Sequence, residues 1–189
     1  TWFVGNSIGN GVPLLNYSIH PNYGARYGAN FFAPNITFGP PGDQFLSDAK
    51  VYHPQDQLGP VYEMKAFLDN SFERLGTVPT SIGNTAEEKQ DIKAFMAEMF
   101  TKTQNGTIAH PPVHDGGDLT TVGYACEVMK WFKPALTVVN MSGVDGCHSS
   151  FTGYLAAMHR ADHAVGHIWD YIQNQVPEMA GNTVIIAIP

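Results

Sequence analysis

Cysteine is scarce in this chain, and neither a basic cluster nor a long apolar run is found in it. Cys126 and Cys147 are the only cysteines, too few for the disulfide framework of a small secreted domain. Lys and Arg number 10 against 17 Asp and Glu, a net charge of −7, so nucleic acid and anionic membrane surfaces are poor partners. No apolar run approaches the roughly 20 residues that span a bilayer, so no membrane partner is expected.

The glycine-rich start of the chain lacks the motifs that bind nucleotides. Gly5, Gly9 and Gly11 permit positive φ in a turn. Neither G-x-G-x-x-G nor a glycine followed by Lys and Ser/Thr occurs there, which excludes the dinucleotide-binding and P-loop classes. A glycine-rich turn is the interpretation that remains.

The composition is that of a folded domain. At 189 residues and 43% hydrophobic content, the chain can bury one sizeable core, and we expect one α/β domain over 1–189. The chain opens on the apolar Trp2-Phe3-Val4 and closes on the apolar stretch 182–189. Apolar runs at both ends are typical of a fragment of a longer protein.

The periodicity of apolar residues predicts the elements. Residues 13–57 are rich in proline and aromatics and predict a long ordered loop, with short extended pieces such as Phe31-Phe32. Thr85 with Glu88 forms a capping box ahead of a helix. The predicted helices are 58–76, 85–102, 119–133 and 151–174, and the predicted strands are 135–141 and 183–188.

The last three elements predict a strand–helix–strand unit. Both strand runs are apolar without alternation, as in a parallel sheet buried on both faces. The intervening helix is long enough for a right-handed crossover. Its apolar face is expected to comprise Phe151, Tyr154, Leu155, Met158, Val165, Ile168, Trp169 and Ile172. The fold class is therefore α/β, a mainly parallel sheet flanked by helices.

Asp145 and His148 are the first candidate metal ligands. They occupy a loop that follows a buried strand, the place where parallel α/β proteins carry their sites. A carboxylate oxygen and an imidazole nitrogen suit Zn²⁺. The alternative is an Asp that turns the loop and a His that packs.

His159, His163 and His167 are the alternative metal ligands. Their four-residue spacing places them along one stripe of a helix, about one turn apart. Two histidines at i and i+4 can share one Zn²⁺. The competing interpretation is a partly exposed polar face beside the apolar one.

Three weaker patterns complete the candidates. His110 and His114, with Asp115 and Asp118, could hold a metal, but the intervening prolines favour a polar loop. Cys147 could be a nucleophile with His148 as its base, although adjacent loop residues rarely aim at each other. Cys126 lies on an apolar helix face and is expected in the core.

The C-terminal 60 residues, about a third of the chain, resemble the alkaline phosphatase/sulfatase superfamily, which includes nucleotide pyrophosphatases and phosphonoacetate hydrolases. The resemblance rests on the strand VVNMSG (138–143), the loop Asp145-Gly-Cys-His148 and the helical segment 159–169. The closing TVIIAIP (183–189) is similar to the strand that leads into the family's Asp/Glu-His-Gly metal motif. Two residues separate Asp145 from His148, where family members commonly have three.

The resemblance implies a partial alkaline phosphatase-like core and a metal-dependent hydrolase of phosphate or sulfate esters. Asp145 and His148 would hold one of two zinc-type metals. The family's Ser or Thr nucleophile and its other ligands are expected outside this chain, so no catalytic residue is assigned and the fragment is expected to be inactive alone. The family also suggests an exported or periplasmic protein.

A second class of function is a non-catalytic ligand-binding module. Tyr17, Tyr23 and Tyr27 in the segment 13–57 would hold a sugar or a peptide. Separately, an open sheet edge could pair with a second copy of the chain and give a homo-oligomer.

Overall fold

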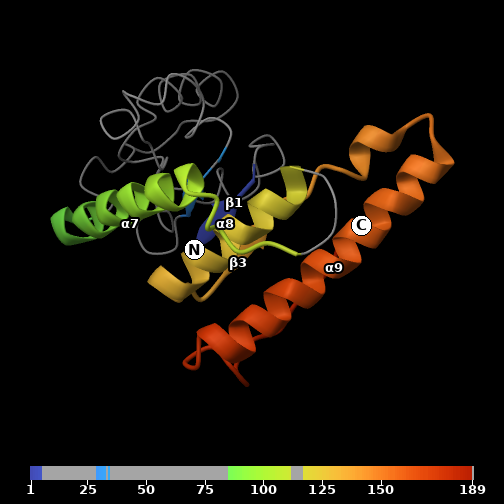
Figure 1. The fold of residues 1–189 in the computed structure, drawn as a ribbon. Coiled ribbons are helices and arrows are strands. Elements are labelled where there is room, and N and C mark those ends of the chain that lie inside the picture. The colour runs from blue at the N-terminus through green and yellow to red at the C-terminus, as the bar shows by residue number, and fades with distance from the viewer. Residues whose placement is uncertain (6–28, 33, 35–84, 112–116, 189) are drawn as a thin grey trace, which may run out of the picture.

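The computed structural model describes residues 1–5, 29–32, 34, 85–111 and 117–188. The predicted helix 58–76 lies outside these residues, as does most of the predicted loop 13–57. Figure 1 shows the described elements, with helices gathered around a small sheet.

The sheet has three short parallel strands. They are β1 (Trp2–Val4), β2 (Asn30–Phe32) and β3 (Thr137–Val139), in the order β2-β1-β3. Both pairings are parallel, and Phe3 stands opposite Phe31 on one side and Val138 on the other. The predicted α/β class with a parallel sheet is confirmed at this level.

Side chains of the central strand alternate between two apolar layers. Phe3 belongs to a cluster with Ala29 and Phe31, whereas Trp2 and Val4 belong to the larger cluster that includes the helices. All three β1 side chains are at most 4% exposed. Burial on both faces explains why this strand is uniformly apolar.

Helix α7 (Ala86–Gln104) begins at the predicted capping box. The Thr85 hydroxyl accepts from Glu88 N, and the Glu88 carboxylate accepts from Thr85 N. The ring of Phe95, further along the helix, packs edge-on against Trp2 at a centroid distance of 6.2 Å. Local capping and long-range packing thus fix the same helix, which confirms the prediction over 85–102.

Helix α8 (Gly117–Phe132) is the central helix of the core. Every residue from Thr121 to Met129 is buried, and the helix contacts β1, β3 and α9. It ends before Pro134, because the residue preceding a proline is disfavoured in the α region. Lys133, between the helix and Pro134, has a positive φ of 42°.

Helix α9 (Phe151–Gln175) begins at Ser150, whose hydroxyl accepts from Gly153 N. In its C-terminal half, Ile168 and Ile172 are buried against the core. Its first turns extend past the sheet (Figure 1), and Phe151 and Leu155 are 76% and 52% exposed. Of the predicted apolar face, only Ile168 and Ile172 are buried, and Trp169 beside them is 45% exposed.

The predicted strand 183–188 is wrong in the structure. The segment is assigned no strand, and no described residue pairs with it. It lines a cavity of about 540 Å³ together with β3. A strand requires a hydrogen-bonded neighbour as well as an apolar sequence, and this segment borders the same cavity as β3 without pairing with it. Val184, Ile186 and Ile188 are left at least 77% exposed.

Within the described part of the chain, none of the helices combines the length and apolar character needed to cross a membrane.

Candidate metal loop and histidine helix

The candidate loop leaves the sheet at the carboxyl end of β3. Asn140 N donates to Val4 O at 2.9 Å, which extends the β1–β3 ladder by one step. A Cβ on Gly5 would lie 2.6 Å from the Cβ of Asn140, closer than real side chains approach. Glycine at position 5 thus allows the ends of β1 and β3 to approach each other where the loop begins.

Asp118, on the first turn of α8, holds the next part of the loop. Its Oδ1 accepts from Ser142 N at 2.9 Å and its Oδ2 from Gly143 N at 2.7 Å. A Cβ on Gly143 would collide with Oδ2. The sequence offered Asp118 as a ligand of a metal loop, and the structure engages both of its oxygens in anchoring the β3 loop.

The predicted ligands Asp145 and His148 lie together on the outside of this loop. The 3₁₀ turn η3 (Asp145–Cys147) brings Asp145 Oδ1 to 3.8 Å from His148 Nε2. The two side chains are 88% and 80% exposed. The alternative interpretation required a His that packs, but the side chain of His148 is exposed.

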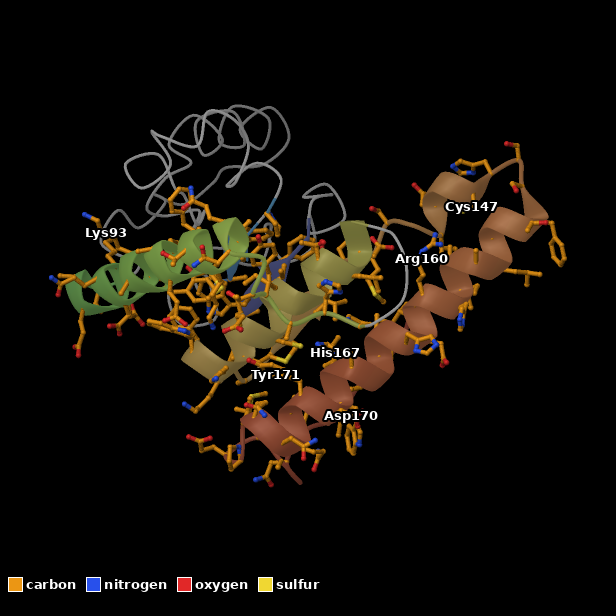
Figure 2. The ribbon with its side chains drawn as sticks, viewed as in Figure 1. Lys93, Cys147, Arg160, His167, Asp170 and Tyr171 are labelled. Atoms are coloured by element: carbon orange, nitrogen blue, oxygen red, sulfur yellow. The ribbon has the colours of Figure 1, made fainter. Side chains whose placement is uncertain are left out.

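Cys147 takes no part in a nucleophile–base pair. Its Sγ donates to Gly143 O at 3.2 Å, within the same loop. Figure 2 shows it on η3, at the end of the molecule far from α7. The other thiol, Cys126, is fully buried on α8 as predicted, and burial raises its pKa to about 12, with a smaller contribution from the Glu127 carboxylate.

The three helix histidines divide into a pair and a single residue. The rings of His159 and His163 meet edge to face at a centroid distance of 4.5 Å, and both side chains are exposed. His167 is half-buried, and its ring centroid lies 6.2 Å from that of Tyr171. In Figure 2 His167 and Tyr171 lie on the side of α9 toward α8, and Asp170 points away from it.

Burial governs the chemistry of His167. Desolvation lowers its pKa, and a hydrogen bond with the backbone of Ala109 partly opposes this shift. Its Nε2 is buried and has no hydrogen-bond partner among the described residues. His167 and His163 nevertheless border one open cavity of about 570 Å³, together with Asp162, Asp170, Trp169 and Pro111.

Further ligands for either candidate do not come from the described residues, where no three His, Cys, Asp or Glu side chains gather closely enough to hold a metal. The Nδ1 of His110 lies 3.0 Å from the carbonyl oxygen of the adjacent Pro111. His114 and Asp115 lie outside the described residues, and so do Tyr17, Tyr23 and Tyr27 of the alternative ligand-binding module.

Sequence reasoning missed one buried ion pair. Glu127, on the otherwise apolar α8, is 4% exposed and accepts from Lys102 Nζ of α7 at 2.8 Å. Lys102 also lies 2.9 Å from Glu98. The signal available in the sequence was a lone carboxylate inside an apolar helix, which requires a partner when buried.

Searches for similar proteins found no protein-family model, no curated protein and no solved structure that matches this chain. Its function is therefore inferred from the residues of the site itself.

Proposed function

We propose that this chain forms part of a metal-dependent hydrolase of phosphate or sulfate esters, in which Asp145 and His148 hold one zinc-type metal. One observation carries the proposal. A carboxylate oxygen and an imidazole nitrogen lie 3.8 Å apart on a single 3₁₀ turn, in the loop that follows the carboxyl end of a parallel strand. Loops at this end of parallel sheets are the usual place of α/β active sites.

The donor pair fits one side of a zinc site. Oxygen and nitrogen ligands bound at 2.0–2.1 Å to a tetrahedral Zn²⁺ lie roughly 3.4 Å from each other. The Asp145–His148 separation of 3.8 Å requires only a small adjustment, and the exposed side chains are free to make it. Among the described residues, neither side chain makes another hydrogen bond or ion pair that a metal would have to break.

Anchoring of the loop supports the same assignment. Asp118 holds the Ser142 and Gly143 backbone from α8, so the turn that carries the donor pair starts from a fixed position. Preorganised ligands lose less entropy when a metal binds. Asp118 would act here as a positioning residue.

Bound metals would supply Lewis-acid activation of the nucleophile and stabilisation of charge on the ester oxygens. Asp145 and His148 would bind and orient one ion. Since a zinc site usually has four ligands, two protein donors predict weak binding. We accordingly expect no efficient hydrolysis from this chain without further ligands and a nucleophile, and we propose that the chain is part of an alkaline phosphatase-like core.

Zinc titration of the metal-free chain tests the proposal. Weak binding, followed by calorimetry and by the visible absorption of Co²⁺ as a substitute, is expected to disappear in Asp145→Asn and His148→Gln. Asp170→Asn and His110→Gln, exposed residues of the same types elsewhere, are matched controls that should bind as the unaltered chain does.

Hydrolysis is measured with p-nitrophenyl phosphate, bis(p-nitrophenyl) phosphate and p-nitrophenyl sulfate. Little or no turnover is expected. Robust phosphodiesterase or sulfatase activity that survives Asp145→Ala would contradict the proposal, as would zinc affinity that is indifferent to both ligand substitutions.

A further inference from the structure

We infer that His159 and His163 form a second metal site, a two-histidine chelate on the surface of α9 that takes Cu²⁺ in preference to Ni²⁺ or Zn²⁺. The site is separate from the Asp145–His148 loop and does not depend on the function proposed for that loop. It rests on the geometry of one helical turn and on the burial of its neighbours.

The two imidazoles are already in contact. They are four residues apart, the spacing at which side chains on one helix face are neighbours. Their ring centroids are 4.5 Å apart and their planes are inclined at 78°. Both side chains are exposed, so rotation to direct two nitrogens at one ion meets no packed core.

The helix beneath the pair is held in place. Ala157 and Ala164, which bracket His159 and His163, are 3% and 0% exposed. The pair also lies in the interior of α9, which continues from Phe151 to Gln175. The backbone is therefore preorganised, and only two exposed side chains must be ordered when the ion binds.

His167 does not belong to the chelate. Its ring lies against Tyr171, and its Nε2 is buried, whereas His159 and His163 face solvent. The structure thus reduces the three-histidine stripe to two ligands. This agrees with the finding that no group of three potential ligands forms among the described residues.

The number of protein ligands determines which ion the site prefers. Imidazole nitrogen suits Cu²⁺, Ni²⁺ and Zn²⁺, and their affinities for a given site follow the order in which Cu²⁺ binds most tightly. A tetrahedral Zn²⁺ site normally uses three or four protein ligands. Two adjacent nitrogens and two waters instead complete the tetragonal plane that Cu²⁺ favours.

Copper titration of the full metal-free chain, by calorimetry and by electron paramagnetic resonance, tests this inference. The tightest Cu²⁺ bound by the unaltered chain should have a spectrum of two imidazole nitrogens. His159→Ala and His163→Ala should each weaken this site at least 10-fold and reduce the signal to one nitrogen. Alanine is the best helix former, so both variants should keep α9, which circular dichroism verifies.

His167→Ala is the matched control on the same helix, and it should retain the two-nitrogen signal and the affinity. An Asp145→Asn/His148→Gln double variant should retain them as well, which separates this site from the loop. Unchanged copper binding in His159→Ala/His163→Ala would overturn the inference, and so would an equal loss in His167→Ala.

Discussion

The Asp118 carboxylate accepts a 2.7 Å hydrogen bond from the backbone N–H of Gly143, and so ties the first turn of α8 to the loop after β3. The second carboxylate oxygen accepts from Ser142 N at 2.9 Å. Two elements far apart in the sequence are thus joined by one side chain at the edge of the candidate metal site.

Replacement of Asp118 should destabilise the protein. Asp118→Ala removes a charged acceptor from two backbone donors, and hydrogen bonds to charged groups contribute about 1.5–3 kcal/mol. The free energy of unfolding in urea should fall by an amount in this range. The exposed Asp170→Asn should change it by less than about 0.5 kcal/mol, and an equally small effect of Asp118→Ala would show that the anchor is dispensable.

Two glycines of the same loop provide a matched comparison. A Cβ at Gly143 would collide with Asp118 Oδ2, whereas a Cβ at Gly146 would meet nothing within 4 Å. Gly143→Ala should therefore lower the urea midpoint clearly, and Gly146→Ala should leave it nearly unchanged. Similar midpoints for both variants would mean that the loop accommodates the extra methyl by moving.

The two halves of α9 should respond differently to truncation of an aliphatic side chain. Ile172 is 1% exposed and Leu155 is 52% exposed. Ile172→Ala should cost about 2–5 kcal/mol, because it removes buried contacts and leaves a cavity, and Leu155→Ala should cost less than about 0.5 kcal/mol. Equal losses in urea unfolding would indicate that the N-terminal half is covered in solution.

Stability should decline in mildly alkaline solution because of Cys126. Burial raises the pKa of this thiol from 9.0 to about 12. The unfolded chain therefore releases the proton above pH 9 while the folded chain retains it, so the stabilisation is intact below pH 9 and is lost as the pH rises toward 12. The slope reaches roughly 1.4 kcal/mol per pH unit.

The measurement is urea unfolding at pH 8, 9 and 10, which ends where the buried tyrosines Tyr124 and Tyr171, also with raised pKa values, begin to ionise in the unfolded chain. Cys126→Ala should flatten the decline between pH 9 and 10. A slope that Cys126→Ala leaves unchanged would assign the decline to other groups.

The two thiols should differ in reactivity. Cys126 is fully buried and Cys147 is partly exposed. A disulfide reagent at neutral pH should modify one thiol per folded chain, and Cys147→Ser should abolish that phase. The second thiol should react only at the rate of unfolding, so two rapid modifications in the native protein would contradict the packing of α8.

Local signals in the sequence were sufficient for α7, α8, α9 and the strand β3, whereas the parallel sheet was predicted through a strand–helix–strand unit that the structure does not form. Thr85 and Glu88 mark the start of α7, and the spacing of apolar residues marks α8 and α9, because capping and periodicity act within a few residues. The stretch 183–188 shows the limit of such signals. Its apolar pattern is that of a strand, but pairing depends on a neighbour that the pattern does not specify.

The candidate site was predicted in part. Asp145 and His148 could be chosen because the preceding strand and their spacing are local features. The role of Asp118 could not, since its partners Ser142 and Gly143 lie 24 and 25 residues away. Nor could the sequence separate His167 from His159 and His163, because the identical spacing conceals which residue faces α8.

The first turns of helix α9 extend past the sheet and its last turns pack in the core. The two ends of one continuous helix should therefore open at different rates. Its last turns open only when the core opens, since Ile168 and Ile172 are part of that core. Its first turns can fray without disturbing the core, in the range of low opening free energies that local fluctuations reach. The candidate metal loop runs from the Asp118 anchor to this fraying end, so a ligand bound there would be coupled to the winding and unwinding of a helix terminus.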